Sequence, residues 1–173
     1  MTDERQAETP QYPANAVHLM RTTQLAQLQL SAMADTKANI VMGATFVIFT
    51  ITIGQAHNAT APLPLLILGA AAFFSAVFAV LAILPATHYK RGGPINLLFF
   101  GSFTQLKEDE YIDQVLDRLG SDETIYRTMV RDIFQNGQVL ERKKYKLLGY
   151  AYRIFLVGLT ASFAAFVVQY FTT

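Results

Sequence analysis

Between Lys37 and Lys90 the chain contains no Asp, Glu, Lys or Arg. This uncharged stretch consists of two apolar blocks, Ala38 to Gln55 and Leu63 to Leu84, separated by a short polar segment. A helix needs about 20 mostly apolar residues to cross the roughly 30 Å hydrocarbon core of a bilayer. A backbone in lipid must satisfy its own hydrogen bonds, and a helix does so. Residues 38–84 are therefore predicted to form a transmembrane hairpin.

A third charge-free block runs from Ile154 to Thr173. The alternative is that all three blocks are core helices of a soluble domain. In a chain of 173 residues, too few residues remain to wrap three such helices. We therefore expect an all-α integral membrane protein with three transmembrane helices, the third within residues 148–173.

Basic residues flank the apolar blocks at the ends away from the hairpin loop. They are Lys37, Lys90, Arg91 and the cluster from Arg142 to Lys146, whereas residues 55–63 carry no charge. The positive-inside rule places the basic ends in the cytoplasm. This orientation predicts a cytoplasmic N-terminus, a cytoplasmic region at 85–147 and a C-terminus outside.

Two of the three membrane helices are predicted to extend into the cytoplasm as stalks. Residues 1–14 are expected to be a disordered tip, and no strong helix breaker interrupts residues 15–55, so residues 15–37 would form the first stalk. A short acidic amphipathic helix is predicted at 108–119. A second long helix is predicted at about 122–171, because an apolar series continues toward the third block and only Asn136-Gly137 interrupts that series. The cytoplasmic region is thus expected to be small and helical.

An aromatic run, Asn96 to Phe103, follows a turn marked by Gly92, Gly93 and Pro94. The run is too short to span a bilayer. It is compatible with a strand, a helical turn lying under the headgroups, or a plug between the stalks.

One face of the first helix carries small and polar residues. Ala32, Asp35, Asn39 and Gly43 are three or four positions apart and therefore share a side of the helix. Membrane helices use such residues where they pack against one another. We place Asp35, Asn39 and Gly43 in the interior of a helix bundle; a gating or ion-path role for this face is the alternative.

The sequence offers little for catalysis or metal binding. It contains no cysteine, and its three histidines are scattered. No zinc-protease, phosphate-loop or nucleophile-elbow motif is present. We therefore predict no catalytic residues, no metal and no resident cofactor. The net charge of +1 gives no reason to expect a nucleic-acid partner.

Four residues of the cytoplasmic region form a candidate ligand site. Arg127 and Arg131 are four apart and share a helix face, and guanidinium groups bind phosphate with two hydrogen bonds. Lys107 could add charge, and Tyr126 could stack on a base. The alternative is structural: Arg127 would pair with Glu123, and Arg131 with a carboxylate of the short helix.

The order of several segments resembles the Pycsar effector transmembrane family. These segments are Ala34-Asp-Thr-Lys-Ala-Asn39, Asn96-Leu-Leu-Phe-Phe-Gly-Ser-Phe103, Tyr126-Arg-Thr-Met-Val-Arg-Asp-Ile-Phe134 and Leu140-Glu-Arg-Lys-Lys-Tyr-Lys-Leu-Leu148. The resemblance extends from about residue 15 to the C-terminus. None of the segments is a catalytic signature.

The resemblance implies a non-enzymatic antiphage effector in the bacterial inner membrane. In such systems a cognate cyclase makes cyclic CMP or cyclic UMP, and the effector senses this nucleotide and impairs membrane integrity to abort infection. Its partners would be the lipid bilayer, the nucleotide and further copies of itself. The alternative is a membrane anchor or scaffold whose cytoplasmic helices recruit a partner protein.

Overall fold

The computed structural model describes residues 12–57, 62–85 and 95–172, and every regular element within these ranges is a helix. The predicted all-α fold is confirmed for this part of the chain. The described residues divide into two compact units. We call residues 12–27 and 95–136 the first unit, and residues 28–57, 62–85 and 137–172 the second unit. The turn at Gly92 to Pro94 and most of the predicted N-terminal tip lie outside the described residues.

Three helical runs are long and apolar enough to cross a membrane. Helix α1 (Ala16–His57) is one continuous helix, as predicted, and α2 (Leu63–Ile83) begins directly after Pro62. The third run covers Asp122–Thr172 and ends in α6 (Lys146–Thr172). Where a bilayer begins along α1 stays a prediction, and so does the stalk at 15–37.

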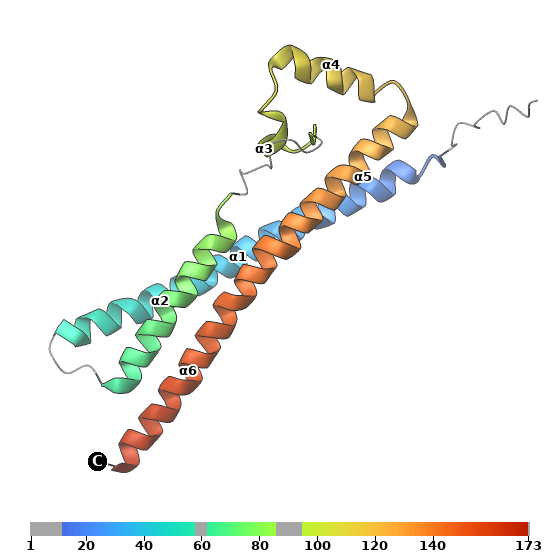
Figure 1. Ribbon diagram of the computed structural model, residues 1–173. Helices are drawn as coiled ribbons and strands as arrows, with labels where there is room; N and C mark the ends of the chain where they lie inside the picture. The colour runs from blue at the N-terminus through green and yellow to red at the C-terminus, as the bar shows by residue number, and fades with distance from the viewer. Residues whose placement is uncertain (1–11, 58–61, 86–94, 173) are drawn as a thin grey trace, which may run out of the picture. The chain divides into compact units, whose positions relative to one another are not determined.

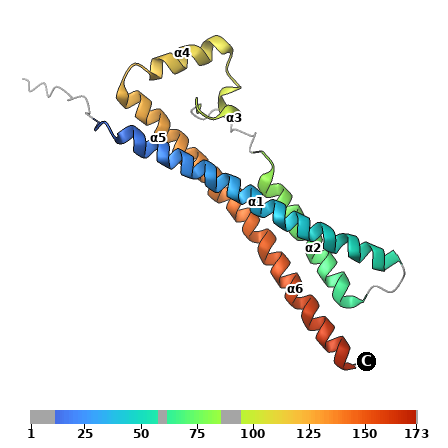
Figure 2. The same cartoon turned by 180° about the vertical axis from the view of Figure 1, so that it is seen from behind.

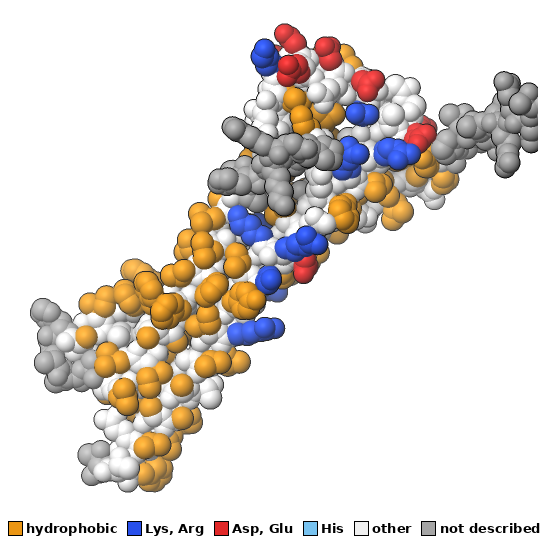
Figure 3. Space-filling model, in the orientation of Figure 1, with side chains coloured by type: hydrophobic (Ala, Val, Ile, Leu, Met, Phe, Trp, Pro, Cys, Tyr) orange, Lys and Arg blue, Asp and Glu red, His pale blue; other side chains and the backbone are white. Residues whose placement is uncertain are grey.

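Small residues form the centre of the second unit. Helices α2 and α6 run beside each other in both views (Figures 1 and 2) and pack together with α1. Small side chains allow helices to approach closely, which is how membrane helices gain packing energy. Larger apolar side chains cover the surface of α2 and α6 that Figure 3 displays. The buried core residues are Ala34, Ala38, Val41, Ala79, Ala82, Leu148 and Ala151.

Two glycines lie at close helix contacts of this unit. A Cβ built at Gly69 would lie 2.6 Å from Thr52 Cγ2 of α1, and a Cβ at Gly158 would collide with Ala71 of α2. Hydroxyl groups strengthen the contact between α2 and α6. Ser75 donates to the Ala151 carbonyl at 2.8 Å, and Ser162 donates to the Pro64 carbonyl at 2.7 Å.

The buried face of α1 lies beside the face that the sequence singled out. The buried positions recur every three, four or seven residues, as expected for one face of a helix. They are Ala34, Ala38, Val41, Thr45 and Thr52. Asn39 and Gly43 are exposed in the single chain, and a Cβ at Gly43 would meet nothing within 4 Å. Both stripes satisfy the same periodicity, so spacing alone does not choose between them. The place of Asn39 and Gly43 in a bundle of several copies stays a prediction.

The long C-terminal helical run contains a π-helical segment that the sequence did not indicate. Helix α5 (Asp122–Val139) passes into η1 (Leu140–Tyr145), a π-helix, before α6 begins. Asn136 and Gly137 interrupt the apolar series of the sequence, but both lie inside α5, so the helix continues through them as predicted. Asn136 donates from its side chain to Asp132, four residues earlier, which supports the helix there.

The first unit adds two short helices before α5. The aromatic run contains α3 (Phe100–Phe103), a single helical turn, so the strand interpretation is wrong. Helix α4 (Glu108–Arg118) matches the predicted acidic helix, and Figure 3 shows the acidic side chains gathered over it. Its apolar side is only partly covered, since Ile112, Leu116 and Leu119 remain exposed.

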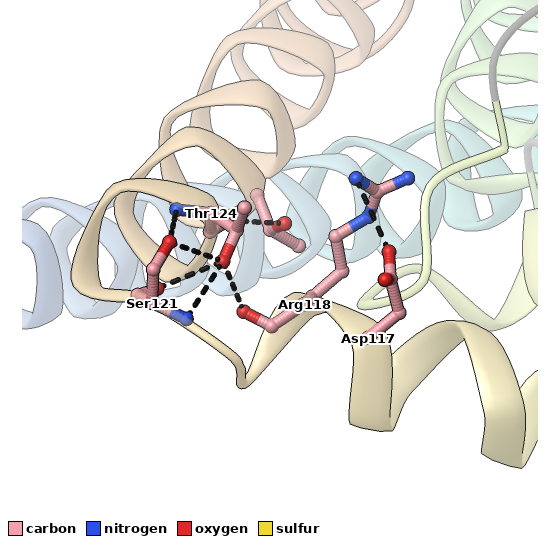
Figure 4. Close-up of polar contacts among 5 residues, drawn as sticks. Asp117, Arg118, Ser121 and Thr124 are labelled. Carbon is pink, nitrogen blue, oxygen red and sulfur yellow. Dashed lines mark hydrogen bonds and ion pairs between the residues drawn. The ribbon is translucent and has the colours of Figure 1, made fainter. Parts of the chain in front are cut away.

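The turn between α4 and α5 is closed by reciprocal capping bonds (Figure 4). The Ser121 hydroxyl accepts a hydrogen bond from the Thr124 N–H, and the Thr124 hydroxyl accepts one from the Ser121 N–H, both at 3.3 Å. Thr124 Oγ1 also lies 2.6 Å from the Arg118 carbonyl, to which it donates. Ser121 thus caps α5, and the turn fixes the last residue of α4.

Replacing Gly158 by Ala is expected to destabilise the packing of α2 on α6. The added methyl group has no room beside Ala71, and overpacking of this kind costs about 1–3 kcal/mol. Gly149→Ala in the same helix is the matched control, because nothing lies within 4 Å of its Cβ position. Thermal unfolding in detergent should show a lower midpoint for Gly158→Ala alone. Equal midpoints for the two variants would contradict the close contact.

Candidate functional site

A buried carboxylate joins three segments of the first unit. Asp132 of α5 is only 5% exposed. It accepts hydrogen bonds from Gln24 Nε2 of α1 at 3.1 Å, Asn96 Nδ2 at 3.0 Å and Asn136 Nδ2 at 2.8 Å. A buried carboxylate is costly unless hydrogen bonds replace its water. The three amides supply those bonds, and among the described residues no cation pairs with Asp132.

The same network fixes the segment before α3. Asn96 is almost fully buried, donates its N–H to the Ser102 hydroxyl at 2.9 Å, and accepts the Leu98 N–H at 3.0 Å. Tyr111 of α4 donates to the Leu97 carbonyl at 3.3 Å. Its ring also lies against Phe103, with the ring centroids 4.8 Å apart. Residues 95–99 therefore form a fixed wall beside α4 and α5.

A pocket of about 210 Å³ lies between this wall and the two helices. Gln114 and Arg118 lie four residues apart on α4, and Thr128 and Arg131 lie three apart on α5, so each pair shares one helix face. The pocket therefore combines two guanidinium groups, two amides and a hydroxyl with apolar walls. Its lining residues are Ile95, Asn96, Leu97, Gln114, Arg118, Thr128 and Arg131.

Of the four ligand-binding residues predicted from the sequence, the pocket includes Arg131. Lys107 is exposed and precedes α4 at the end opposite Arg118, about 16 Å away along an 11-residue helix. The ring of Tyr126 lies against that of Tyr12, with centroids 4.7 Å apart. The structure thus does not gather these four residues into one site.

Arg127 follows the structural alternative. It forms an ion pair with Glu123, one helical turn earlier, and its side chain is 72% exposed. The hydrogen bond to Glu123, and then the charge of that carboxylate, raise the pKa of the guanidinium above its ordinary value. The structural alternative also paired Arg131 with a carboxylate of the short helix α4. Within the described residues Arg131 forms no such ion pair.

The second unit contains one well-formed ion pair, which ties η1 to α1. Lys144 Nζ lies 2.7 Å from both carboxylate oxygens of Asp35 and 2.7 Å from the Ser31 hydroxyl. The Lys144 side chain is only 18% exposed. Tyr145 adds a hydrogen bond to the Leu30 carbonyl at 3.2 Å. Asp35, predicted for the bundle interior, is therefore a partner of the π-helical segment, and an ion-path role for it stays untested.

Sequence reasoning missed Asp132, Asn96, Gln114 and Arg118. One signal was present for Asp132, because it lies three residues after Met129 and next to Ile133 and therefore shares the apolar side of α5. Gln114 and Arg118 carry no local signal, since the α4–α5 turn brings them beside α5. Asn96 carries none either, because its partners Ser102 and Asp132 hold it in place. No group of three or more His, Cys, Asp or Glu that could hold a metal occurs among the described residues.

These features define a class: a helical protein with three helices of membrane-spanning length and a separate unit that holds an arginine-lined pocket. The family model described as the Pycsar effector protein domain matches residues 18–171, nearly the whole chain. The chain belongs to this family, as the resemblance of its segments indicated. No curated protein and no solved structure matches the chain.

Replacing Asp132 by Asn should loosen the first unit. The Asn side chain has an NH2 group where Asp132 has its second acceptor oxygen, and this group faces other N–H donors. At least one hydrogen bond is therefore lost, which lowers the free energy of unfolding by about 1–3 kcal/mol. Asp113→Asn is the control, because Asp113 is an exposed residue of α4. Hydrogen exchange of the full chain should become faster at residues 95–99 and 128–136 in Asp132→Asn only. Unchanged exchange there would show that the network is not needed.

Proposed function

We propose that the protein is an antiphage effector of the bacterial inner membrane that binds cyclic CMP or cyclic UMP and then impairs membrane integrity. Membership of the Pycsar effector family over residues 18–171 carries this proposal. The three helices of membrane-spanning length support the site of action. The arginine-lined pocket of the first unit supports a small anionic ligand. The protein acts without catalysing a reaction.

Continuous helices offer a route from ligand to membrane. Helix α1 contributes Gln24 to the first unit and Asp35 to the second, and the run from α5 through η1 to α6 likewise belongs to both. A ligand that binds one arrangement of the first unit more tightly shifts the population toward that arrangement. We expect the conformational change to involve the η1 segment, because π-helical turns are rare and frequently occur at functional positions.

The membrane lesion requires several copies of the chain, because three helices cannot enclose a wide aqueous pore. The exposed face of α1 suits such self-association. Asn39 and Gly43 lie on it, and small and polar residues on membrane helices mediate helix–helix contacts. The expected assembly is a homo-oligomer with this face turned inward.

A second function is favoured by the exposed apolar side of α4. Ile112, Leu116 and Leu119 follow one another at helical spacing and are 44%, 60% and 59% exposed. Such a face is typical of a docking site for another protein. On this basis the chain would be a membrane scaffold that recruits a cytoplasmic partner through α4.

Purified protein in liposomes loaded with a fluorescent dye distinguishes the two functions. Cyclic UMP or cyclic CMP at micromolar concentration should release the dye, while cyclic AMP serves as the matched nucleotide control. Calorimetric titration on the same preparation measures binding separately from leakage. Folded protein that binds neither pyrimidine nucleotide would contradict the sensor function. Binding without leakage would contradict the membrane lesion and favour the scaffold.

A further inference from the structure

The functional groups of the pocket are not equally free to meet a ligand. Asn96 uses its amide N–H on Asp132 and its oxygen on Leu98. The Thr128 hydroxyl donates to the Thr124 carbonyl at 2.8 Å, so only its oxygen lone pairs remain. In the described part of the chain, the side chains of Gln114 and Arg131 have no hydrogen bond or ion pair. The hydrogen-bonding groups of Asn96 are therefore already occupied, whereas the side chains of Gln114 and Arg131 are available to bind a ligand.

Its charge is also unbalanced. Arg118 has one carboxylate nearby, Asp117, at 3.8 Å and on an exposed surface, which is worth little. The buried carboxylate next to the pocket, Asp132, is satisfied by three amides and faces Asn96. Two guanidinium groups thus line one small cavity without a strong anionic partner. A guanidinium prefers an oxyanion that accepts two parallel hydrogen bonds, as a phosphate does.

We propose that Arg118 and Arg131 hold the cyclic phosphodiester of the nucleotide and that Gln114 hydrogen-bonds the edge of the pyrimidine. This assignment rests on the proposed function and adds the site to it. A Gln amide offers both donors and an acceptor. By turning its amide it matches the acceptor–donor edge of cytosine or the donor–acceptor edge of uracil. Ile95 and Leu97 supply the apolar wall against which the ring packs.

The size of the pocket is that of a site for a small ligand. Sites for drug-sized molecules occupy roughly 300–1,000 Å³, whereas this pocket measures about 210 Å³. A single pyrimidine nucleotide, partly open to water, suits this volume. A cyclic dinucleotide carries a second base and a second phosphate, for which the pocket has neither space nor further cations.

Calorimetric titration of the full chain in detergent with cyclic UMP and cyclic CMP tests the assignment. Arg118→Gln and Arg131→Gln should each weaken binding by roughly 10- to 100-fold, the usual loss for a hydrogen bond to a charged group. Arg127→Gln is the matched control, because Arg127 lies on the same helix as Arg131, is exposed, and is paired with Glu123. Gln114→Leu should weaken both nucleotides while leaving the binding of inorganic phosphate unchanged.

The outcomes separate the site from the function. Wild-type binding that survives both Arg118→Gln and Arg131→Gln overturns the site and leaves the sensor function standing. No binding by folded wild-type protein overturns the sensor function and the site together. A helical circular-dichroism spectrum shows that each variant is folded. Arg131→Lys keeps the positive charge and should therefore lose less affinity for the nucleotide than Arg131→Gln. If Arg127→Gln weakened nucleotide binding as much as Arg131→Gln, the assignment of the site would also be overturned.

Discussion

The organisation of the first unit depends on one buried charge. The carboxylate of Asp132 is held by amides from α1, from the segment before α3 and from α5. Because an unsatisfied buried carboxylate is strongly unfavourable, these three segments must come together for the unit to fold. The wall at Asn96 and the pocket beside it follow from that requirement.

The second unit is stabilised in a different way. Its helices meet through Ala, Gly and Ser, with hydroxyl groups bonded to backbone carbonyls across the contact of α2 and α6. This packing needs no exclusion of water, so it works in lipid, where the hydrophobic effect does not drive helices together. One polar pair, Asp35 with Lys144, fixes η1 to α1. The same two long helical runs thus contribute to a unit with a polar pocket and to a unit of closely packed apolar helices.

The sequence predicted what depends on the distribution of charge along the chain. The uncharged stretch after Lys37 predicted two apolar helices of membrane-spanning length, and the absence of breakers predicted α1 and the run from Asp122 as long helices. It did not predict η1, because the hydrogen bonds of Lys144 and Tyr145 that accompany this segment reach residues more than a hundred positions away. Tertiary contacts of that kind leave no local pattern.

The same limit applies to the site. Arg131 was found because arginine spacing on a helix is visible in a sequence. Arg118 and Gln114 were not, because their place beside α5 depends on the Ser121–Thr124 turn. Arg127 carries the same spacing signal as Arg131, yet it pairs with Glu123 on the surface. On α1 the buried stripe and the predicted stripe are neighbours, and only the packing of α2 and α6 decides between them.

We propose that a nucleotide bound in the first unit changes the second. Hydrogen exchange of the full chain in lipid nanodiscs, with and without cyclic UMP or cyclic CMP, measures this directly. We expect slower exchange at 95–99, 114–118 and 128–131 together with altered exchange at η1, residues 140–145. Protection confined to the first unit, with η1 unchanged at saturating nucleotide, would contradict it.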